Sequence, residues 1–346
     1  MLLKPGGQAV FIASNSWGLA RRKAEYAREL QDAGFERWLV EYQGLGSSRI
    51  GRLCASAFPN LTILARQAPL IRALAPEILL QAWKSTSGTT AAAPSLCEHP
   101  GLRGAVSVVI PCHNEALNVR RVVDGLREMY GDYLHEIILV DDNSRDATRQ
   151  VIEALARDDA RIKPIFRSPP NGVGRAIRDG MRMATGEFIL SMDCDFQHLL
   201  PELRDLFDAA AEGCDAVYGS RFSTQTVLRG YPFPKLVANR LFHSVAGCLL
   251  GHRVRDCTNN LKLLRREVAA NLLLTQPGFG VNAQTGLQPL RMGFRVKEVP
   301  ISWINRSSDM GVSSFRLLRV GRDYCQALLG AWRSKKEAHQ NQGIEE

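Results

Sequence analysis

Short apolar runs alternate with amphipathic segments in the middle of the chain. The apolar runs are rich in β-branched residues and predict buried strands over residues 106–110, 136–140, 162–166, 188–192 and 216–219. Between them, apolar positions recur at helical spacing over residues 116–128, 146–156, 172–184 and 201–211. Strands that alternate with helices through short connections are typical of a mostly parallel sheet. We therefore expect an α/β domain with helices on both faces of its sheet.

A change in composition divides the chain before this pattern begins. Residues 86–103 are small, polar and interrupted by Pro and Gly, which is typical of a linker. We expect a partial α/β segment over residues 1–85, the main domain over 104–330 and a polar tail over 331–346.

Overall composition excludes two classes of protein. Hydrophobic residues make up 45% of the chain and charged residues 23%, as in ordinary folded domains, so a mostly disordered chain is excluded. A polytopic membrane protein is also excluded, because no run of about 18 apolar residues occurs. The first residues lack the apolar run of a signal peptide, and the eight cysteines show no zinc-binding spacing. Reduced thiols and a cytoplasmic location are therefore expected.

Charge is unevenly distributed within the net value of +9. Residues 101–228 contain 15 basic and 20 acidic side chains, whereas residues 229–346 contain 18 basic and 8 acidic ones. An acidic region suits cations, and a basic region suits phosphates or an anionic membrane surface. The basic third lacks interleaved aromatic residues and nucleic-acid-binding motifs, so we expect no nucleic-acid partner.

Polar and acidic residues follow each of the predicted strands. Strand 106–110 leads into Pro111-Cys-His-Asn-Glu115, strand 136–140 into residues 141–146, and strand 188–192 into Asp193-Cys-Asp195. In an open parallel sheet, ligands bind beyond the carboxyl ends of the strands. We therefore expect these residues to form one site.

Asp193 and Asp195 are the candidate metal ligands. Two neighbouring carboxylates repel each other unless a cation lies between them. Oxygen ligands select Mg²⁺ or Mn²⁺, which bind proteins through one or two carboxylates together with substrate phosphates. Gln197 adds a neutral oxygen in the same loop. An isolated D-x-D motif is common by chance, but its position after an apolar strand favours a metal site.

The motifs in residues 106–115, 140–146, 184–198 and 218–222 together resemble those of family 2 glycosyltransferases. The similarity points to the branch that transfers sugars to dolichol or polyprenyl phosphate. It implies a GT-A fold, a nucleotide-diphosphate-sugar donor, Mg²⁺ or Mn²⁺, and an inverting transfer of a sugar, mannose or glucose among them, to a polyprenyl or dolichyl phosphate. Two alternatives stay open: a glycosyltransferase with a hydroxyl acceptor, and an inactive nucleotide-sugar-binding protein.

The resemblance also implies roles for individual residues. The donor would be bound by Pro111, His113, Glu115, Asp141, Asp142 and Asp193. The metal would be bound by Asp193, Asp195 and Gln197, and the acceptor phosphate by Arg221, Arg306 and Arg316. Asp195 and Arg221 would be the catalytic residues. Gln284 is a departure, because relatives often carry an acid there, and it keeps the inactive alternative open.

Two stretches bear on the membrane. Residues 236–250 and 315–332 mix apolar with basic side chains, as helices in a membrane interface do. Helices packed on the domain would show the same pattern. Peripheral attachment to the cytoplasmic face of a membrane is therefore a hypothesis.

The first segment resembles the C-terminal part of a class I methyltransferase. The similarity lies in the turn beginning at Lys4-Pro-Gly-Gly and in the pair Gly34-Phe35. The glycine-rich loop that would bind S-adenosylmethionine does not occur in it, so we expect no methyl transfer from this segment.

Overall fold

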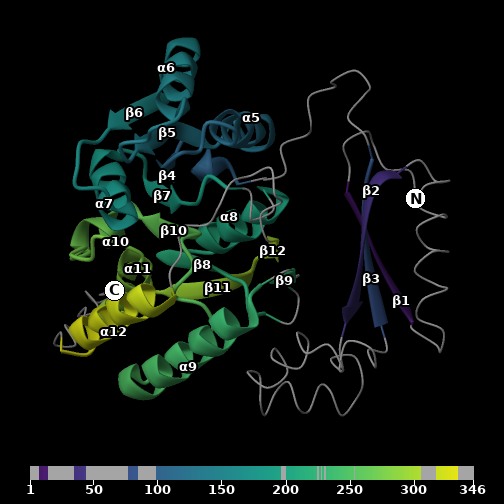
Figure 1. Cartoon of the computed structure of the whole chain (residues 1–346), viewed down its shortest axis with the longest axis vertical. Coiled ribbons are helices and arrows are strands. Elements are labelled where there is room, and N and C mark those ends of the chain that lie inside the picture. The colour runs from purple at the N-terminus through teal and green to yellow at the C-terminus, as the bar shows by residue number, and fades with distance from the viewer. Residues whose placement is uncertain are drawn as a thin grey trace, which may run out of the picture. The chain divides into compact units, whose positions relative to one another are not determined.

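The computed structural model consists of two compact units, Met1–Ala92 and Ala93–Glu346 (Figure 1). The described residues of the first unit are three strands. In the second unit the structure describes residues 99–195, 200–223, 226, 228–229, 231–252, 254–304 and 317–333.

The first unit contains an antiparallel sheet. Its strands are β1 (Gln8–Ser14), β2 (Phe35–Gln43) and β3 (Glu77–Lys84), and β3 lies between the other two and is antiparallel to both. This sheet lies within the segment that the sequence predicts to be a partial α/β unit. Its resemblance to a methyltransferase stays a prediction.

The second unit is built on a seven-stranded sheet with the order β11-β8-β10-β7-β4-β5-β6. Only β10 runs antiparallel to its two neighbours, so the predicted mostly parallel sheet is confirmed. The strands are β4 (Val106–Cys112), β5 (Leu134–Asp141), β6 (Ile162–Phe166), β7 (Phe188–Ser191), β8 (Ala216–Ser220), β10 (Lys262–Arg265) and β11 (Val296–Pro300).

Helices cover both faces of this sheet, as the sequence predicts (Figure 1). One core cluster joins the sheet to α5 (Val119–Tyr130), α6 (Thr148–Asp158) and α8 (Leu203–Ala211). The core cluster on the other face includes α7 (Val173–Met183), α10 (Arg266–Asn271) and α11 (Gly280–Met292). Two short 3₁₀ turns lie at Pro100–Leu102 and Leu200–Glu202.

The spacing of apolar residues explains these elements. In α5 the side chains of Val119, Val122, Val123 and Leu126 are all buried, so one face of the helix packs on the sheet. The β4 side chains alternate between the two core clusters: Val108 and Ile110 lie in one, and Val109 lies in the other.

The last third of the chain adds a helical layer. Helices α9 (Phe233–Leu250) and α12 (Leu317–Arg333) share a small third core cluster with α11. A two-stranded parallel ladder joins β9 (Leu228–Arg229) to β12 (Trp303–Ile304). Among the helices that the structure describes, none combines the length and the hydropathy needed to span a bilayer.

At Gly286, α11 packs closely against the loop before β10. A Cβ atom at Gly286 would lie 2.3 Å from the carbonyl oxygen of Cys257 and 2.6 Å from its Cβ. Since both are firmly held atoms, we expect Gly286→Ala to lower the free energy of unfolding by about 1–3 kcal/mol in urea denaturation. Gly330→Ala in α12 is the matched control, because a Cβ atom there would meet no neighbouring atom within 4 Å. A loss of stability no larger for Gly286→Ala than for the control would contradict this packing.

Candidate active site

Two neighbouring strands, β4 and β5, supply the first part of the site. They run parallel in a register that places Cys112 opposite Asp141, so the loops that follow them start side by side. Asn114 and Asn143 each adopt a positive φ, 58° and 57°. Asparagine tolerates this left-handed conformation better than most side chains, and it turns each loop sharply at the edge of the sheet.

Hydrogen bonds fasten these two loops to each other. The Asn114 side chain accepts the backbone N–H of Arg145 at 2.8 Å, and the Glu115 N–H donates to Thr148 Oγ1 at 2.8 Å. His113 Nδ1 donates to the carbonyl oxygen of Asp142 at 2.9 Å. The predicted donor-binding residues Pro111, His113, Glu115, Asp141 and Asp142 are thus brought together at one edge of the sheet.

Asp142 connects this edge to the start of α7. Its buried carboxylate pairs with Arg167 and accepts the backbone N–H of Gly172 at 2.6 Å. Arg167 also pairs with Asp179 at 2.7 Å, so one guanidinium joins β6, the β5 loop and α7. In this structure the Asp142 carboxylate positions the Gly172 turn, and its contact with a donor stays a prediction.

A second loop, residues 275–278, packs closely on the same turn. The Gly174 N–H donates to the carbonyl oxygen of Pro277 at 3.0 Å. A Cβ atom at Gly174 would lie 2.2 Å from the carbonyl oxygen of Gln276, so glycine is needed for this approach.

Gln284 shapes that loop. Its Oε1 accepts the backbone N–H groups of Thr275 and Gln276 at 3.0 Å each, and its Nε2 donates to Thr275 Oγ1 at 2.8 Å. Both halves of the buried amide are used, so the residue that departs from the family's pattern has a positioning role here.

The D-x-D motif follows β7, which neighbours β4 in the sheet. Asp193 Oδ1 accepts Asn260 Nδ2 at 2.9 Å, and Asn260 Oδ1 in turn accepts Ser191 Oγ at 2.7 Å. The buried Asp195 side chain is only 6% exposed. The third predicted ligand, Gln197, lies outside the described residues.

Cys194 separates the two carboxylates and belongs to the core. Its thiol is hydrogen-bonded to Cys112, and this contact, together with burial, raises the pKa of Cys194 well above its usual value. The thiol therefore stays protonated and adds no further negative charge between Asp193 and Asp195.

The donor set fits a hard divalent cation. In the part of the chain that the structure describes, no three His, Cys, Asp or Glu side chains converge as a metal cluster. Asp193 and Asp195 supply oxygen ligands of the kind that such a cation prefers, and their binding of a metal stays a prediction. A site with few protein ligands is typical of Mg²⁺ or Mn²⁺ bound jointly by carboxylates and substrate phosphates.

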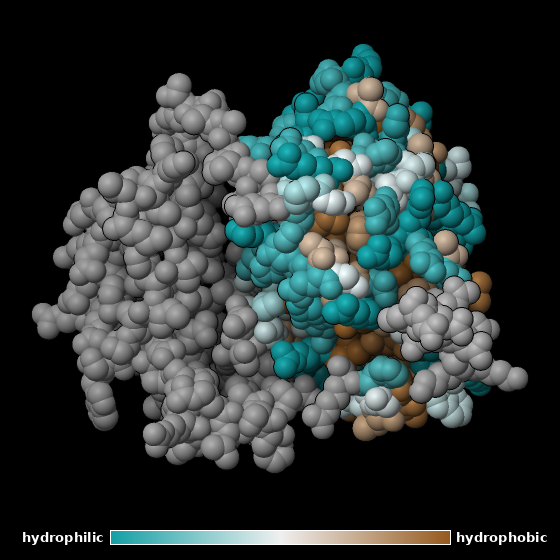
Figure 2. All heavy atoms as spheres, turned by 180° about the vertical axis from the view of Figure 1, so that it is seen from behind, coloured by the Kyte–Doolittle hydropathy of each residue, from teal (hydrophilic) through white to brown (hydrophobic). Residues whose placement is uncertain are grey.

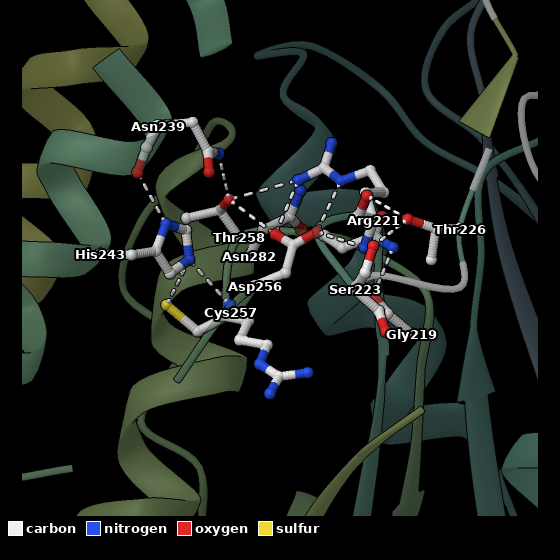
Figure 3. Close-up of polar contacts among 12 residues, drawn as sticks. Gly219, Arg221, Ser223, Thr226, Asn239, His243, Asp256, Cys257, Thr258 and Asn282 are labelled. Atoms are coloured by element: carbon white, nitrogen blue, oxygen red, sulfur yellow. Dashed lines mark hydrogen bonds and ion pairs between the residues drawn. The ribbon is translucent and has the colours of Figure 1, made fainter. Parts of the chain in front are cut away.

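Arg221 directly follows β8 and is buried in an ion pair with Asp256 (Figure 3). The Asp256 carboxylate accepts Arg221 Nε at 2.7 Å, Nη2 at 2.8 Å and the backbone N–H at 3.0 Å. Burial alone would lower the pKa of Arg221, but the Asp256 charge outweighs it and raises the pKa. The Arg221 charge is already paired with Asp256 in this structure. Its binding of the acceptor phosphate stays a prediction.

Helix α9 holds this pair from the other side (Figure 3). Asn239 donates to Thr258 Oγ1 at 2.9 Å, and Thr258 lies beside Asp256. His243 Nε2 accepts the backbone N–H of Cys257 at 2.9 Å, so Nδ1 carries the proton and donates to the Asn239 carbonyl at 2.7 Å. Burial, with the Arg240 charge second, lowers the pKa of His243 to about 3, and the ring is neutral.

Lys235, in the first turn of α9, is a candidate site residue that the sequence reasoning missed. Burial, with the Arg221 charge second, lowers the pKa of Lys235 to about 8, although the carboxylates of Asp193 and Asp195 act in the opposite direction. Its ammonium lies 5.1 Å from the Tyr231 ring centroid. Because these groups come from distant parts of the sequence, no local signal distinguished Lys235 from a surface lysine. The other predicted phosphate ligands, Arg306 and Arg316, lie outside the described residues.

Comparison with known proteins agrees with this geometry. The profile of Glycosyl transferase family 2 matches residues 107–273. The polyprenol monophosphomannose synthase of Mycolicibacterium smegmatis is 30% identical over 213 residues, which are 60% of this chain and 79% of the relative. The dolichol-phosphate mannosyltransferase of Pyrococcus furiosus is 28% identical over 178 residues, and these cover 51% of this chain and 50% of that protein.

The fold is also found in a solved structure. Glucosyl-3-phosphoglycerate synthase from Mycobacterium tuberculosis, in complex with Mn²⁺, uridine diphosphate and glucosyl-3-phosphoglycerate, superposes with a TM-score of 0.52. The two share 22% identity, and the match covers 68% of this chain and 82% of the other. At this identity the likeness shows the fold, which is of the GT-A type. The profile match and the Mycolicibacterium relative show that this chain belongs to glycosyl transferase family 2 and is a glycosyltransferase.

Proposed function

We propose that this enzyme transfers a sugar from a nucleotide-diphosphate sugar to a polyprenyl or dolichyl phosphate with inversion at the anomeric carbon. The observation that carries the proposal is a half-buried ammonium, Lys235, within electrostatic reach of the Asp193 and Asp195 carboxylates. Such a site can hold a cation on one side and a phosphate on the other. Names of two relatives, a polyprenol monophosphomannose synthase and a dolichol-phosphate mannosyltransferase, favour the same acceptor class.

The donor would lie across the ends of β4, β5 and β7. The loops fastened by His113 and Asn114 would receive the nucleoside, and Asp193 and Asp195 would hold Mg²⁺ or Mn²⁺ against the diphosphate. Such a cation stabilises the negative charge that develops on the departing diphosphate. Gln284 supports this arrangement indirectly, because it orders the loop that packs on Gly174.

The acceptor phosphate needs to be positioned but not deprotonated. A phosphate monoester is already anionic near pH 7, so its oxygen can attack the anomeric carbon directly. The new bond forms between that oxygen and the anomeric carbon, while the bond to the diphosphate breaks and its electron pair leaves with the nucleotide. Lys235 would hold the phosphate in line, and the buried Tyr231 hydroxyl, which has no hydrogen-bond partner among the described residues, is a further donor beside it.

A hydroxyl acceptor is the alternative, and it would require a general base. Gln284 cannot serve as that base, since an amide does not take up a proton at neutral pH and both its halves are already hydrogen-bonded. The names of the two relatives favour the lipid-phosphate acceptor. Peripheral attachment to a membrane belongs to the same proposal, because the acceptor carries a long hydrocarbon chain.

Asp195→Asn tests the donor site. We expect UDP- or GDP-sugars to raise the Tm of the wild-type protein only when Mn²⁺ is present, because a ligand that binds the folded state stabilises it. The variant should lose this Mn²⁺-dependent shift, since a neutral amide is a poor ligand for a divalent cation. Thermal-shift measurements against both donors, with and without Mn²⁺, check it.

Asp158→Asn, an exposed position at the end of α6, is the matched control and should behave like the wild type. A donor-induced shift that Asp195→Asn retains in full would overturn the assignment of this carboxylate to the metal.

Lys235 tests the acceptor site through pH. Its ammonium is charged below its pKa of about 8 and neutral above it, so kcat/KM for a prenyl phosphate should fall as pH rises through about 8. Lys235→Met should lower kcat/KM at pH 7 by about 10- to 100-fold, the cost of losing one charged contact. Lys235→Arg should keep activity and move the alkaline decline to higher pH.

Lys163→Met, at an exposed position of β6, is the control and should change neither value. An unchanged pH profile in Lys235→Arg would show that another group causes the decline.

A further inference from the structure

Helix α9 divides its residues unusually between its two faces. Its buried face contains the polar side chains Asn239, Arg240 and His243, which belong to the ion-pair network, together with Leu236, Ala246 and Leu250. Its exposed face is also apolar at every fourth position. These exposed residues, with their exposed fractions, are Phe233 (52%), Val237 (41%), Leu241 (64%), Val245 (42%) and Leu249 (44%). We call them the α9 stripe.

The exposed face of α9 carries no charge. Besides the stripe, its exposed positions are Pro234, Ser244 and Cys248. An uncharged helix face is unusual on a protein whose net charge is +9. Figure 2 shows the unit from behind, where hydrophobic side chains are interspersed among hydrophilic ones.

Helix α12 extends this surface. It packs on α9 through the rings of Tyr324 and Phe242, whose centroids are 5.4 Å apart. Its exposed residues include Leu329 (44%) and Trp332 (51%). Two exposed arginines, Arg322 and Arg333, lie on the same helix.

We propose that the α9 stripe lies in the headgroup region of a lipid bilayer with its apolar side chains in the acyl boundary. This inference rests on the proposed lipid-phosphate acceptor and names the surface that brings the enzyme to it. A helix of 18 residues is about 27 Å long and can lie flat in the interface along its whole apolar face. Trp332 and the two arginines have the chemistry of groups that lie at the headgroup level and attract anionic lipids.

Continuity with the active site favours a lipid surface over a second protein. Lys235 lies in the same first turn of α9 as Phe233, and its ammonium is within electrostatic reach of Asp193 and Asp195. A bilayer seated on the stripe would therefore meet the site at the end where the acceptor phosphate is proposed to bind. An acceptor could keep its hydrocarbon chain in the membrane while its phosphate reaches Lys235.

The double substitution Leu241→Glu with Val245→Glu tests the surface. It places two negative charges in the middle of the stripe without touching the buried face of α9. We expect the wild-type protein to float with phosphatidylcholine–phosphatidylglycerol vesicles and the variant to bind them at least about tenfold more weakly. Met183→Glu at the end of α7, where the side chain is 40% exposed, is the matched control and should float like the wild type. Equal flotation of the double variant would overturn the proposal.

Transfer rates on two different acceptors distinguish a loss of membrane docking from a loss of catalysis. With a long-chain polyprenyl phosphate embedded in the vesicles, the double variant should lose about tenfold or more in rate. With a short-chain, water-soluble prenyl phosphate it should match the wild type. An equal loss on both acceptors would overturn the docking role. A wild-type protein that floats but transfers sugar to neither acceptor would instead overturn the proposed function and leave the membrane surface standing.

The unmodified protein offers an independent measurement. Cys248 is exposed on the outer face of α9, so a polar maleimide should label it in solution. Mass spectrometry should show slower labelling of Cys248 when the vesicles are added. An unchanged rate would contradict the proposal, as would protection that depends on protein concentration without vesicles, because the latter would indicate a second copy of this chain on the stripe.

Discussion

Negative charge concentrated at one edge of a parallel sheet is the constraint on which the rest of the site depends. The register of β4 with β5 and β7 places Asp141, Asp142, Asp193 and Asp195 at neighbouring strand ends. Two of these carboxylates are satisfied within the chain: Asp142 by Arg167 and the Gly172 N–H, and Asp141 by the N–H of Ser144 at 3.1 Å. For the D-x-D pair, Asp193 accepts an amide hydrogen from Asn260, and Lys235 lies within electrostatic reach of both carboxylates. In the proposed function a divalent cation would bind between these two carboxylates and relieve their mutual repulsion.

The need to pair a buried charge also explains the polar residues on the buried face of α9. Asp256 is completely buried and would be costly without a cation, so Arg221 must be buried with it. The groups around this pair are Asn239, Arg240 and His243, and they share the buried face of α9 with Leu236, Ala246 and Leu250. Other apolar residues of α9 lie on its outer face. A helix with this division of residues is stable in two cases. Either something other than water covers its outer face, or the stabilisation from the buried network exceeds the free-energy cost of the exposed apolar area.

Much of the fold could be predicted from the sequence, because the relevant signals are local. The strand predicted over 162–166 is β6. The helix predicted over 201–211 is α8, which begins two residues later because a 3₁₀ turn precedes it. The antiparallel β10 was missed, since Lys262–Arg265 is too short for periodicity to identify and its Lys262 is buried against distant carbonyl oxygens. In the site, Asp193 and Asp195 are candidates because they follow a strand, and their role in metal binding stays a prediction. Lys235 and the Arg221–Asp256 pair could not, because those contacts join residues that are distant in sequence.

Gln284 shows how a departure from a family pattern is judged by contacts rather than by identity. An acid at this position could accept the N–H groups of Thr275 and Gln276 as Gln284 does, and Thr275 could then donate its hydroxyl proton instead of accepting one. The geometry of loop 275–278 is therefore compatible with either residue. What the amide changes is charge, because it leaves one negative charge fewer on the α11 side of the Gly172 turn. A donor diphosphate approaching the end of β5 would meet less repulsion from that side, so the substitution does not by itself argue against nucleotide-sugar binding.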